Sequence, residues 1–246
     1  DIYIKKIMAF HHSPRIVSNG LIFCMDPANV KGYVSGSTTG TDLIQDASYT
    51  LVNAVDYQSN NGGVWNFGGT DDYINVVNPT VGFPDSDNPR SLCAWVYNTN
   101  TSTRQAVFGY GNNSAGQAFD LIVGTAHAGT QNNIACHVWS SGFETTTDTF
   151  TANEWHYCVI TYAGGSANST NLKLYIDAVD SGYQLNFGSA VTLNTTSNNA
   201  RLGMRAQGSY TDLDFLGQLG PIHMYNRVLT PAEVLQNYNA MKVRFE

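Results

Sequence analysis

The residues best suited to chemistry in this chain are amides and carboxylates that stand close to aromatic rings. Tyr110 is followed two residues later by Asn112 and Asn113, and Trp139 lies in a second stretch that mixes aromatic and polar residues. Sugar recognition needs an aromatic platform flanked by side chains that hydrogen-bond hydroxyl groups. We therefore predict carbohydrate binding by Tyr110, Asn112, Asn113 and Trp139. The competing interpretation places both aromatic rings in a core.

A second candidate site is a pair of carboxylates in a turn. Asp71 and Asp72 end the run Gly-Gly-Thr-Asp-Asp. Calcium takes about six to eight oxygen ligands from carboxylates, carbonyls and water, which such a turn can supply. The sequence thus predicts a Ca²⁺ site at Asp71 and Asp72, with Asp26 or the pair Asp212/Asp214 as rival sources. The alternative is a hairpin turn whose aspartates cap backbone amides.

Catalytic patterns are largely missing. Glycoside hydrolysis needs two carboxyl groups at a defined separation, but the chain has only four glutamates, at positions 144, 154, 233 and 246. Asp212 and Asp214 share a strand face by spacing and are the best remaining pair. No nucleophile elbow, phosphate-binding loop or zinc-binding His-Glu-x-x-His motif occurs. We predict no catalytic residue and a protein that is not an enzyme.

Charge and composition exclude further classes. The chain has 246 residues, a formal net charge of -7 and only 12 Lys and Arg, which are scattered. Contacts to nucleic-acid phosphates need clustered basic residues, so no nucleic-acid partner is expected. No apolar run approaches the roughly 18 residues of a spanning helix, so we expect no membrane insertion. The chain also contains 14 Tyr, 11 Phe and 4 Trp, enough aromatic surface for a folded core.

The hydrophobic pattern is mostly of period two, which is typical of strands. Predicted strands cover residues 21–25, 64–67, 72–77, 91–97, 105–110, 118–123, 134–139, 155–162, 172–177, 200–204 and 214–225. One helix is predicted after Thr230, because Thr230 and Glu233 form a capping box with Pro231 at the first helical position. The pattern predicts an all-β fold, an antiparallel β-sandwich with a short C-terminal helix that packs on a sheet edge or end.

The four cysteines lie in apolar stretches and form no CxxC pair. They are Cys24, Cys93, Cys136 and Cys158. Isolated cysteines among apolar residues usually behave as small buried hydrophobes, so we predict four free, buried thiols. The alternative is a disulfide between facing strands.

Four segments together resemble the laminin-G-like, concanavalin-A-like jelly-roll domains. They are residues 65–74, 155–162, 172–177 and 215–233, in the order and spacing of that family. The resemblance implies one jelly-roll domain over residues 20–246, preceded by an N-terminal arm over residues 1–19. It also implies that the first and last strands are neighbours, and that glycan binding is the usual non-catalytic role.

The beginning and end of the chain narrow the resemblance. Residues 8–33 and 236–242 resemble short structural proteins of tailed bacteriophages, which often begin at the equivalent of Met8. This implies a virion protein, assembled in the host cytoplasm and exposed on the particle as a decoration, fibre or adhesin component. Its partners would be other virion proteins and host-surface or environmental glycans, and it would form homo-oligomers. The alternatives are a stand-alone carbohydrate-binding adhesion domain and, third, a glycoside hydrolase.

The chain departs from the family pattern at two places. Gly220 and Pro221 stand where many members carry acidic residues, which weakens an inherited calcium site. Ala178 stands where a glycine usually makes the hairpin turn. Because alanine tolerates a positive φ poorly, a looser or longer turn is expected there.

Overall fold

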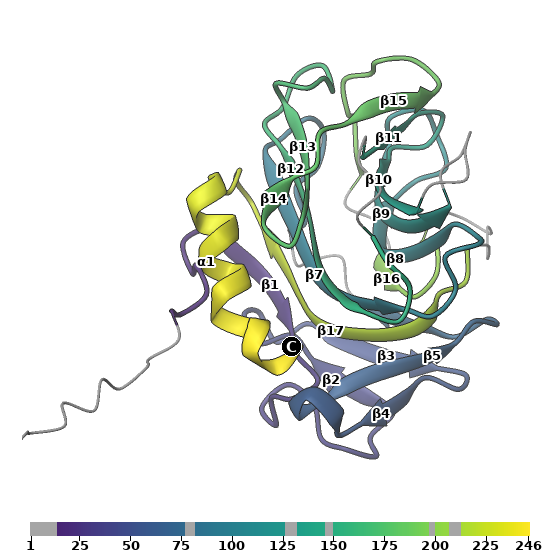
Figure 1. Cartoon of the computed structure of the whole chain (residues 1–246), viewed down its shortest axis with the longest axis vertical. Coiled ribbons are helices and arrows are strands. Elements are labelled where there is room, and N and C mark those ends of the chain that lie inside the picture. Colours follow the sequence, from purple (N-terminus) through teal and green to yellow (C-terminus); the bar gives the residue numbers. More distant parts are fainter. Residues whose placement is uncertain (1–13, 77–81, 126–131, 146–149, 197–199, 207–212) are drawn as a thin grey trace, which may run out of the picture.

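The strands form two facing antiparallel sheets, and one helix lies on the outside of the first (Figure 1). The computed structural model describes residues 14–76, 82–125, 132–145, 150–196, 200–206 and 213–246. The predicted antiparallel β-sandwich with a short C-terminal helix is confirmed. No helix in the described ranges is both long and apolar enough to cross a membrane.

The first sheet, sheet A, is built around the last strand of the chain. Its strands are β1 (Leu21–Met25), β4 (Asp56–Gln58), β5 (Val64–Gly68), β7 (Arg90–Asn98), β12 (Trp155–Tyr162), β13 (Leu172–Ile176), β14 (Val179–Asp180) and β17 (Leu216–Tyr225). The spatial order is β14-β13-β12-β7-β17-β5-β4. β17 pairs with β7 along one edge, and its other edge pairs with β5 and then with β1. The expected pairing of the first and last strands is therefore confirmed.

The second sheet, sheet B, faces sheet A across the core. Its strands are β2 (Thr39–Thr41), β3 (Ser48–Val52), β6 (Tyr73–Val76), β8 (Gln105–Gly111), β9 (Ala118–Thr125), β10 (Asn132–His137), β11 (Gly142–Glu144), β15 (Gln184–Phe187) and β16 (Ala200–Leu202). The order is β15-β11-β10-β9-β8-β16-β6-β3-β2. Sequence patterns missed β2, β3, β4, β11, β14 and β15, which have five residues or fewer and therefore show few alternations.

Alternate residues of both sheets fill the space between them. On β7, Leu92 and Val96 face this core, and Phe108 and Leu121 face it from sheet B. Trp65 is completely buried here and contacts the rings of tyrosines at its edge. All four cysteines are buried and unpaired, which confirms the predicted free thiols.

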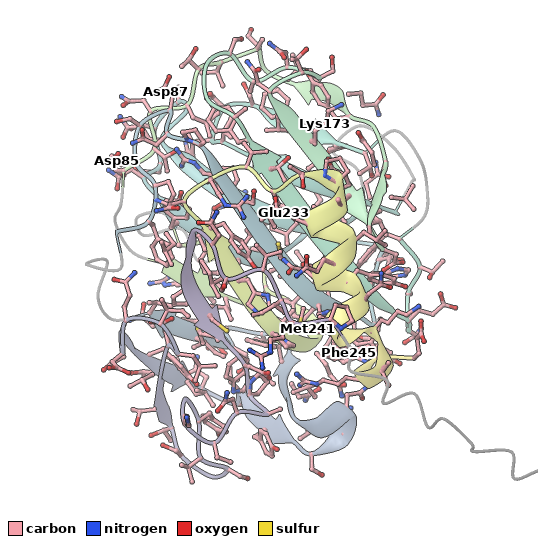
Figure 2. All side chains as sticks on the ribbon, turned by 90° about the vertical axis from the view of Figure 1, so that its left-hand side faces the viewer. Asp85, Asp87, Lys173, Glu233, Met241 and Phe245 are labelled. Carbon is pink, nitrogen blue, oxygen red and sulfur yellow. The ribbon has the colours of Figure 1, made fainter. Side chains whose placement is uncertain are left out.

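Helix α1 (Pro231–Met241) covers the outer face of sheet A, with a last turn η3 (Lys242–Arg244) after it (Figure 2). The predicted capping box is present. The predicted position at a sheet edge or end is wrong, because the outward residues of sheet A are themselves apolar. Trp95 on β7 stacks on Tyr238 and on Phe245, with ring centroids 5.6 and 4.4 Å apart. Sheet A is thus buried on both faces.

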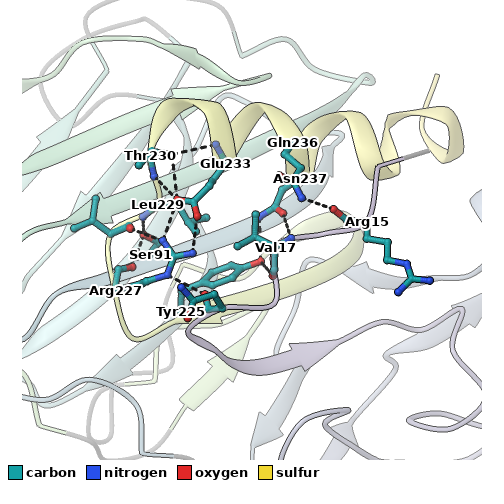
Figure 3. Close-up of polar contacts among 12 residues, drawn as sticks. Arg15, Val17, Ser91, Tyr225, Arg227, Leu229, Thr230, Glu233, Gln236 and Asn237 are labelled. Carbon is teal, nitrogen blue, oxygen red and sulfur yellow. Dashed lines mark hydrogen bonds and ion pairs between the residues drawn. The ribbon is translucent and has the colours of Figure 1, made fainter. Parts of the chain in front are cut away.

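The described start of the chain is fastened to this helix (Figure 3). The Asn237 side chain accepts the Val17 N–H at 2.8 Å and donates to the Tyr225 hydroxyl at 3.0 Å. That hydroxyl donates to the Val17 carbonyl at 2.9 Å, and Gln236 donates to the Arg15 carbonyl at 2.7 Å. Residues 15–17, which belong to the predicted arm, therefore pack against α1 and β17.

The local structure accounts for both departures from the family pattern. Asp177 and Ala178 have φ of 52° and 65° between the paired residues Ile176 and Val179. They form a tight two-residue turn, so the expected looser or longer turn is wrong. Gly220 and Pro221 lie where the register of β17 shifts between Leu219 and Ile222. Such a bulge accommodates a proline, which cannot donate to a neighbouring strand.

Candidate functional site

Two turns at one end of sheet B bring together three of the predicted sugar-binding residues. Asn112 and Asn113 lie in the turn between β8 and β9, where Asn112 N–H donates to the Gln117 carbonyl at 3.0 Å. Trp139 lies in the turn between β10 and β11 with φ of 56°. The Gly116 N–H donates to the Val138 carbonyl at 2.8 Å, so the two turns are adjacent. Asn113 is exposed, and Asn112 and Trp139 are half-buried.

Tyr110 does not belong to this group. Its side chain is fully buried, its hydroxyl accepts from Arg90 at 2.7 Å, and it donates to the Pro84 carbonyl at 2.8 Å. A ring without exposed surface cannot stack on a sugar, so the prediction for Tyr110 is wrong. The competing interpretation, a core residue, holds. Successive strand residues point to opposite faces, and Tyr110 has the inward position on β8.

The outer face of sheet B carries a row of polar residues that sequence reasoning did not assemble. The row follows the strand register through Asn75, Arg201, Gly109, Asp120 and His137. Residues directly opposite each other on one face have Cβ atoms about 4.5–5.5 Å apart. Asp120 and His137 are neighbours only through the pairing of β9 with β10, so their spacing in the sequence does not reveal the pair.

Gly109 leaves the space that this row needs. A Cβ atom at Gly109 would lie 2.1 Å from Oδ1 of Asp120. The Asp120 carboxylate therefore occupies the position of a side chain at 109, next to the strand that carries Arg201. Asp120 and His137 are 1% and 3% exposed, and Glu144 on β11 is 1% exposed. Hydrogen bonding or pairing must satisfy charges buried to this degree.

Two arginines on this side of the sheet lie over aromatic rings. The guanidinium of Arg205 is 5.3 Å from the ring centre of Trp139, and that of Arg201 is 4.6 Å from that of Tyr73. Arg201 is half-buried, donates weakly to the Arg205 carbonyl at 3.4 Å, and its Nε has no partner among the described residues. A stacked guanidinium is held in one orientation, which favours recognition of hydroxyl or carboxylate oxygens.

The two aspartates predicted to bind calcium take part in hydrogen bonds to the backbone and to Asn53. Asp72 is 3% exposed, and its two oxygens accept the N–H groups of Ala54 and Gly68 at 2.8 and 2.7 Å. Asp71 is exposed, and its carbonyl accepts from Asn53 at 2.5 Å. Among the described residues, no three His, Cys, Asp or Glu side chains are placed to hold a metal ion. Amide capping accounts for Asp72, and calcium binding stays a prediction.

The residues weighed for glycoside hydrolysis are not brought together as a pair. Asp214 is half-buried just before β17, and Asp212 lies outside the described residues. Glu154 accepts from the Thr151 hydroxyl at 2.5 Å on an exposed turn. Glu144 lies on the outer face of sheet B, separated from Asp120 by the whole of strand β10.

Comparison with known proteins places the chain by fold. Residues 67–235 match the Laminin_G_3 model of the concanavalin A-like lectin/glucanases superfamily. A comparison with curated protein sequences gives no significant match. Domain 4 of AbnA, a GH43 extracellular arabinanase from Geobacillus stearothermophilus solved with arabinotriose, has a TM-score of 0.65 at 15% identity. That alignment covers 89% of this chain and 98% of the domain.

Two further structures share the fold. The binding domain of Paraclostridial Mosquitocidal Protein 1 has a TM-score of 0.60 at 14% identity, covering 90% of this chain and 52% of that one. Trypanosoma rangeli sialidase with sialic acid has a TM-score of 0.57 at 12% identity, covering 92% and 33%. These identities are low and show likeness of fold alone. The family model, however, spans more than half of the sequence, and the chain belongs to the concanavalin A-like lectin/glucanase superfamily as a laminin-G-like domain.

Proposed function

We propose that the chain is a non-enzymatic carbohydrate-binding domain whose ligand lies on the outer face of sheet B, against Trp139. The observation that carries the proposal is the meeting of three kinds of group at this end of the sheet. They are a half-buried indole, the amides of Asn112 and Asn113, and the stacked guanidinium of Arg201. Membership of the concanavalin A-like lectin/glucanase superfamily supports a carbohydrate ligand.

Each group has a distinct part in binding. The apolar C–H face of a sugar ring packs on the indole of Trp139, which Arg205 holds from one side. The asparagine amides donate to and accept from hydroxyls, and Arg201 donates to ring or hydroxyl oxygens. Asp120 and His137 are buried below this surface.

A glycan array with the purified protein tests the proposal. We expect selective binding that Trp139→Ala weakens at least tenfold and Asn113→Ala weakens about tenfold, the latter as the loss of one or two hydrogen bonds predicts. Trp155→Phe is the control, because Trp155 begins β12 and is half-buried on the outer face of sheet A, on the opposite side of the sandwich. Binding that Trp139→Ala leaves unchanged would place the ligand elsewhere.

The same glycan-array experiment also tests calcium binding. The proposal includes a Ca²⁺ ion at Asp71 and Asp72 that stabilises the loops, so binding is measured with calcium and with EDTA. Loss of binding in EDTA, reproduced by Asp71→Asn, supports the ion. The exposed Asp87→Asn is the control for loss of one negative charge. Equal binding in both buffers removes calcium from the proposal and leaves the sugar site.

Absence of hydrolysis is part of the proposal. The carboxylates on and beside the outer face of sheet B, Asp120, Glu144 and Asp214, are the groups that a glycosidase would use. We expect no release of reducing ends from a panel of polysaccharides. Release that Asp214→Asn or Glu144→Gln abolishes would establish the glycoside hydrolase instead.

The finer proposal is a place on the outside of a tailed-phage particle as a decoration, fibre or adhesin component. It is supported by the resemblance of residues 8–33 and 236–242 to phage structural proteins. Antiserum against the purified chain should label intact particles in electron micrographs, and sedimentation should show homo-oligomers. Unlabelled particles and a monomeric protein that binds glycans would favour a stand-alone adhesion domain.

A further inference from the structure

A hollow of about 320 Å³ lies at the other end of the sandwich, away from Trp139. It forms where the chain passes from β3 in sheet B to β4 in sheet A, under the loop 33–38. β3 is second from one edge of sheet B, and β10 and β11 lie towards the opposite edge. Figure 1 shows the two regions at opposite ends of the molecule. The volume is within the usual range of about 300–1,000 Å³ for small-ligand sites.

The lining of the hollow is aromatic and already fixed. The rings of Tyr33 and Tyr57 have centroids 5.6 Å apart. Tyr33 is 4% exposed, packs edge-on against Trp65, and donates its hydroxyl hydrogen to the Ser37 carbonyl at 2.9 Å. Tyr57 is half-buried and keeps part of its ring accessible. An aromatic ring has a negative face, which attracts the positively polarised C–H groups of a sugar.

The rim supplies acceptors for hydroxyl groups. Asp56 is exposed, and its carboxylate has one long contact, 3.4 Å from Nε2 of Gln58. Asn53 is also exposed and uses its Nδ2 on the Asp71 carbonyl, so its Oδ1 faces no described donor. Burial, and then the charge of Asp56, raise the pKa of Tyr33. Asp56 and Tyr33 both line the hollow.

We propose that this hollow is a second carbohydrate-binding site, selective for neutral sugars. Tyr57, backed by the buried ring of Tyr33, takes the apolar face of one sugar ring, and Asp56 accepts hydrogen bonds from its hydroxyls. A carboxylate makes strong charge-assisted bonds to hydroxyl donors and repels an acidic sugar. The site does not depend on the outer face of sheet B, so a domain with both sites binds a branched or surface-bound glycan at two points and gains avidity.

An adjoining hollow gives room for a ligand longer than one sugar. It has a volume of about 350 Å³, shares Tyr33 and Ser37 with the first, and is lined further by Lys31, Tyr49 and Thr50. The two hollows flank the Tyr33–Ser37 turn. An oligosaccharide that crosses this turn would place adjacent units in both.

Backbone-amide NMR with defined trisaccharides tests the proposal. The probes are arabinotriose and cellotriose as neutral sugars and tri-galacturonic acid as the acidic one. We expect the neutral probes to shift the amides of residues 33–38 and 53–57. Tyr57→Ala should weaken this binding at least tenfold and Asp56→Asn about tenfold. Tyr57→Phe, which keeps the ring, should retain it, and Trp139→Ala should leave these shifts unchanged.

The outcomes separate this proposal from the outer-face site. Shifts confined to residues near 112–113 and 139 would overturn the second site and keep the first. Shifts confined to residues 33–57 would keep the second site and overturn the outer-face site. Binding of tri-galacturonic acid as tight as that of the neutral probes would overturn the assigned selectivity. Asp56→Asn changes an exposed side chain and keeps the fold. If Tyr57→Ala is unstable, the affinity of Asp56→Asn for the neutral probes therefore decides whether the hollow binds sugar.

Discussion

The guanidinium of Arg90 donates a 2.7 Å hydrogen bond to the hydroxyl of Tyr110, and both side chains are completely buried. The other N–H groups of Arg90 donate to the backbone carbonyls of Asp85, Ser86 and Asn88 at 2.8–3.1 Å. A buried charge without pairing is very unfavourable, so these dipoles must replace a carboxylate partner. Arg90 thereby fixes the loop 84–88 to the core.

Removal of the Tyr110 hydroxyl should destabilise the protein. In Tyr110→Phe one N–H of Arg90 and the carbonyl of Pro84 lose their partner inside the core. Because an unsatisfied buried polar group costs about 1–3 kcal/mol, we expect a loss of this size in the free energy of unfolding by urea. Tyr97→Phe is the control, since the half-buried Tyr97 hydroxyl bonds to no described residue. Equal stability of the two variants would contradict the assigned role.

Glycine should be better than alanine at position 178. Ala178 has φ of 65°, a region that costs a non-glycine residue roughly 1–2 kcal/mol. Glycine would remove this cost from the folded state, but the greater flexibility of glycine in the unfolded chain offsets part of the stabilisation. We expect Ala178→Gly to raise the free energy of unfolding by about 0.5–1 kcal/mol. Ala152→Gly, at a residue without a positive φ, should lower it.

Asp177 explains how the chain retains the turn without glycine. Its Oδ1 accepts the Tyr157 N–H at 2.8 Å, and its Oδ2 is 2.8 Å from Nδ1 of His156. His156, near the start of β12, is held by this contact and by the Thr151 hydroxyl 2.9 Å from its Nε2. Asp177→Ala should therefore destabilise the protein more than Ala178→Gly stabilises it, measured by the same urea titration.

Stability should fall in mild acid because of His223. Burial lowers the pKa of His223 to about 4; the nearby Asp26 carboxylate opposes this and the Arg244 guanidinium adds to it. Between about pH 6.5 and pH 4 the unfolded chain binds a proton that the folded protein does not. The free energy of unfolding therefore decreases as the pH falls through this window, by up to about 3 kcal/mol.

Urea titrations at pH 7 and pH 4.5 measure this loss, and His223→Gln should reduce it. Glu233 acts in a different window, since the Arg227 guanidinium lowers the pKa of Glu233 to about 2. The stabilisation from Glu233 is present above about pH 4.5 and is lost only as the pH falls towards 2. An unchanged pH dependence in His223→Gln would assign the acid sensitivity to another group.

The thiols should be inert in the folded protein. Burial raises the pKa of both Cys24 and Cys93 to about 12, and it raises the pKa of Cys136 and Cys158 as well. Reagents such as DTNB attack the thiolate, which is scarce at pH 8 under these conditions. We expect no fast reaction in buffer and four equivalents in 6 M guanidinium. A thiol that reacts within seconds in buffer would show an opening of the sandwich.

Local patterns predicted most of the long strands and the helix, because alternation and capping are properties of neighbouring residues. Residues 21–25 and 155–162 form strands with the predicted bounds. The outer-face row was not predictable, because Arg201, Asp120 and His137 meet only through the pairing of strands distant in sequence. The burial of Tyr110 was equally hidden, since its partner Arg90 comes from the facing sheet. The one sequence signal for the outer-face row was Asp120, an acidic residue inside the otherwise apolar predicted strand 118–123.

The central position of β17 has a consequence for synthesis. It is the last strand of the chain, yet it joins β7 to β5 and β1. Until residue 225 has left the ribosome, both sides of sheet A expose unpaired strand edges, which readily associate with other chains. Pairing of residues about 200 positions apart also slows folding. We therefore expect this domain to complete its fold only after β17 has left the ribosome, and to need protection from aggregation until then.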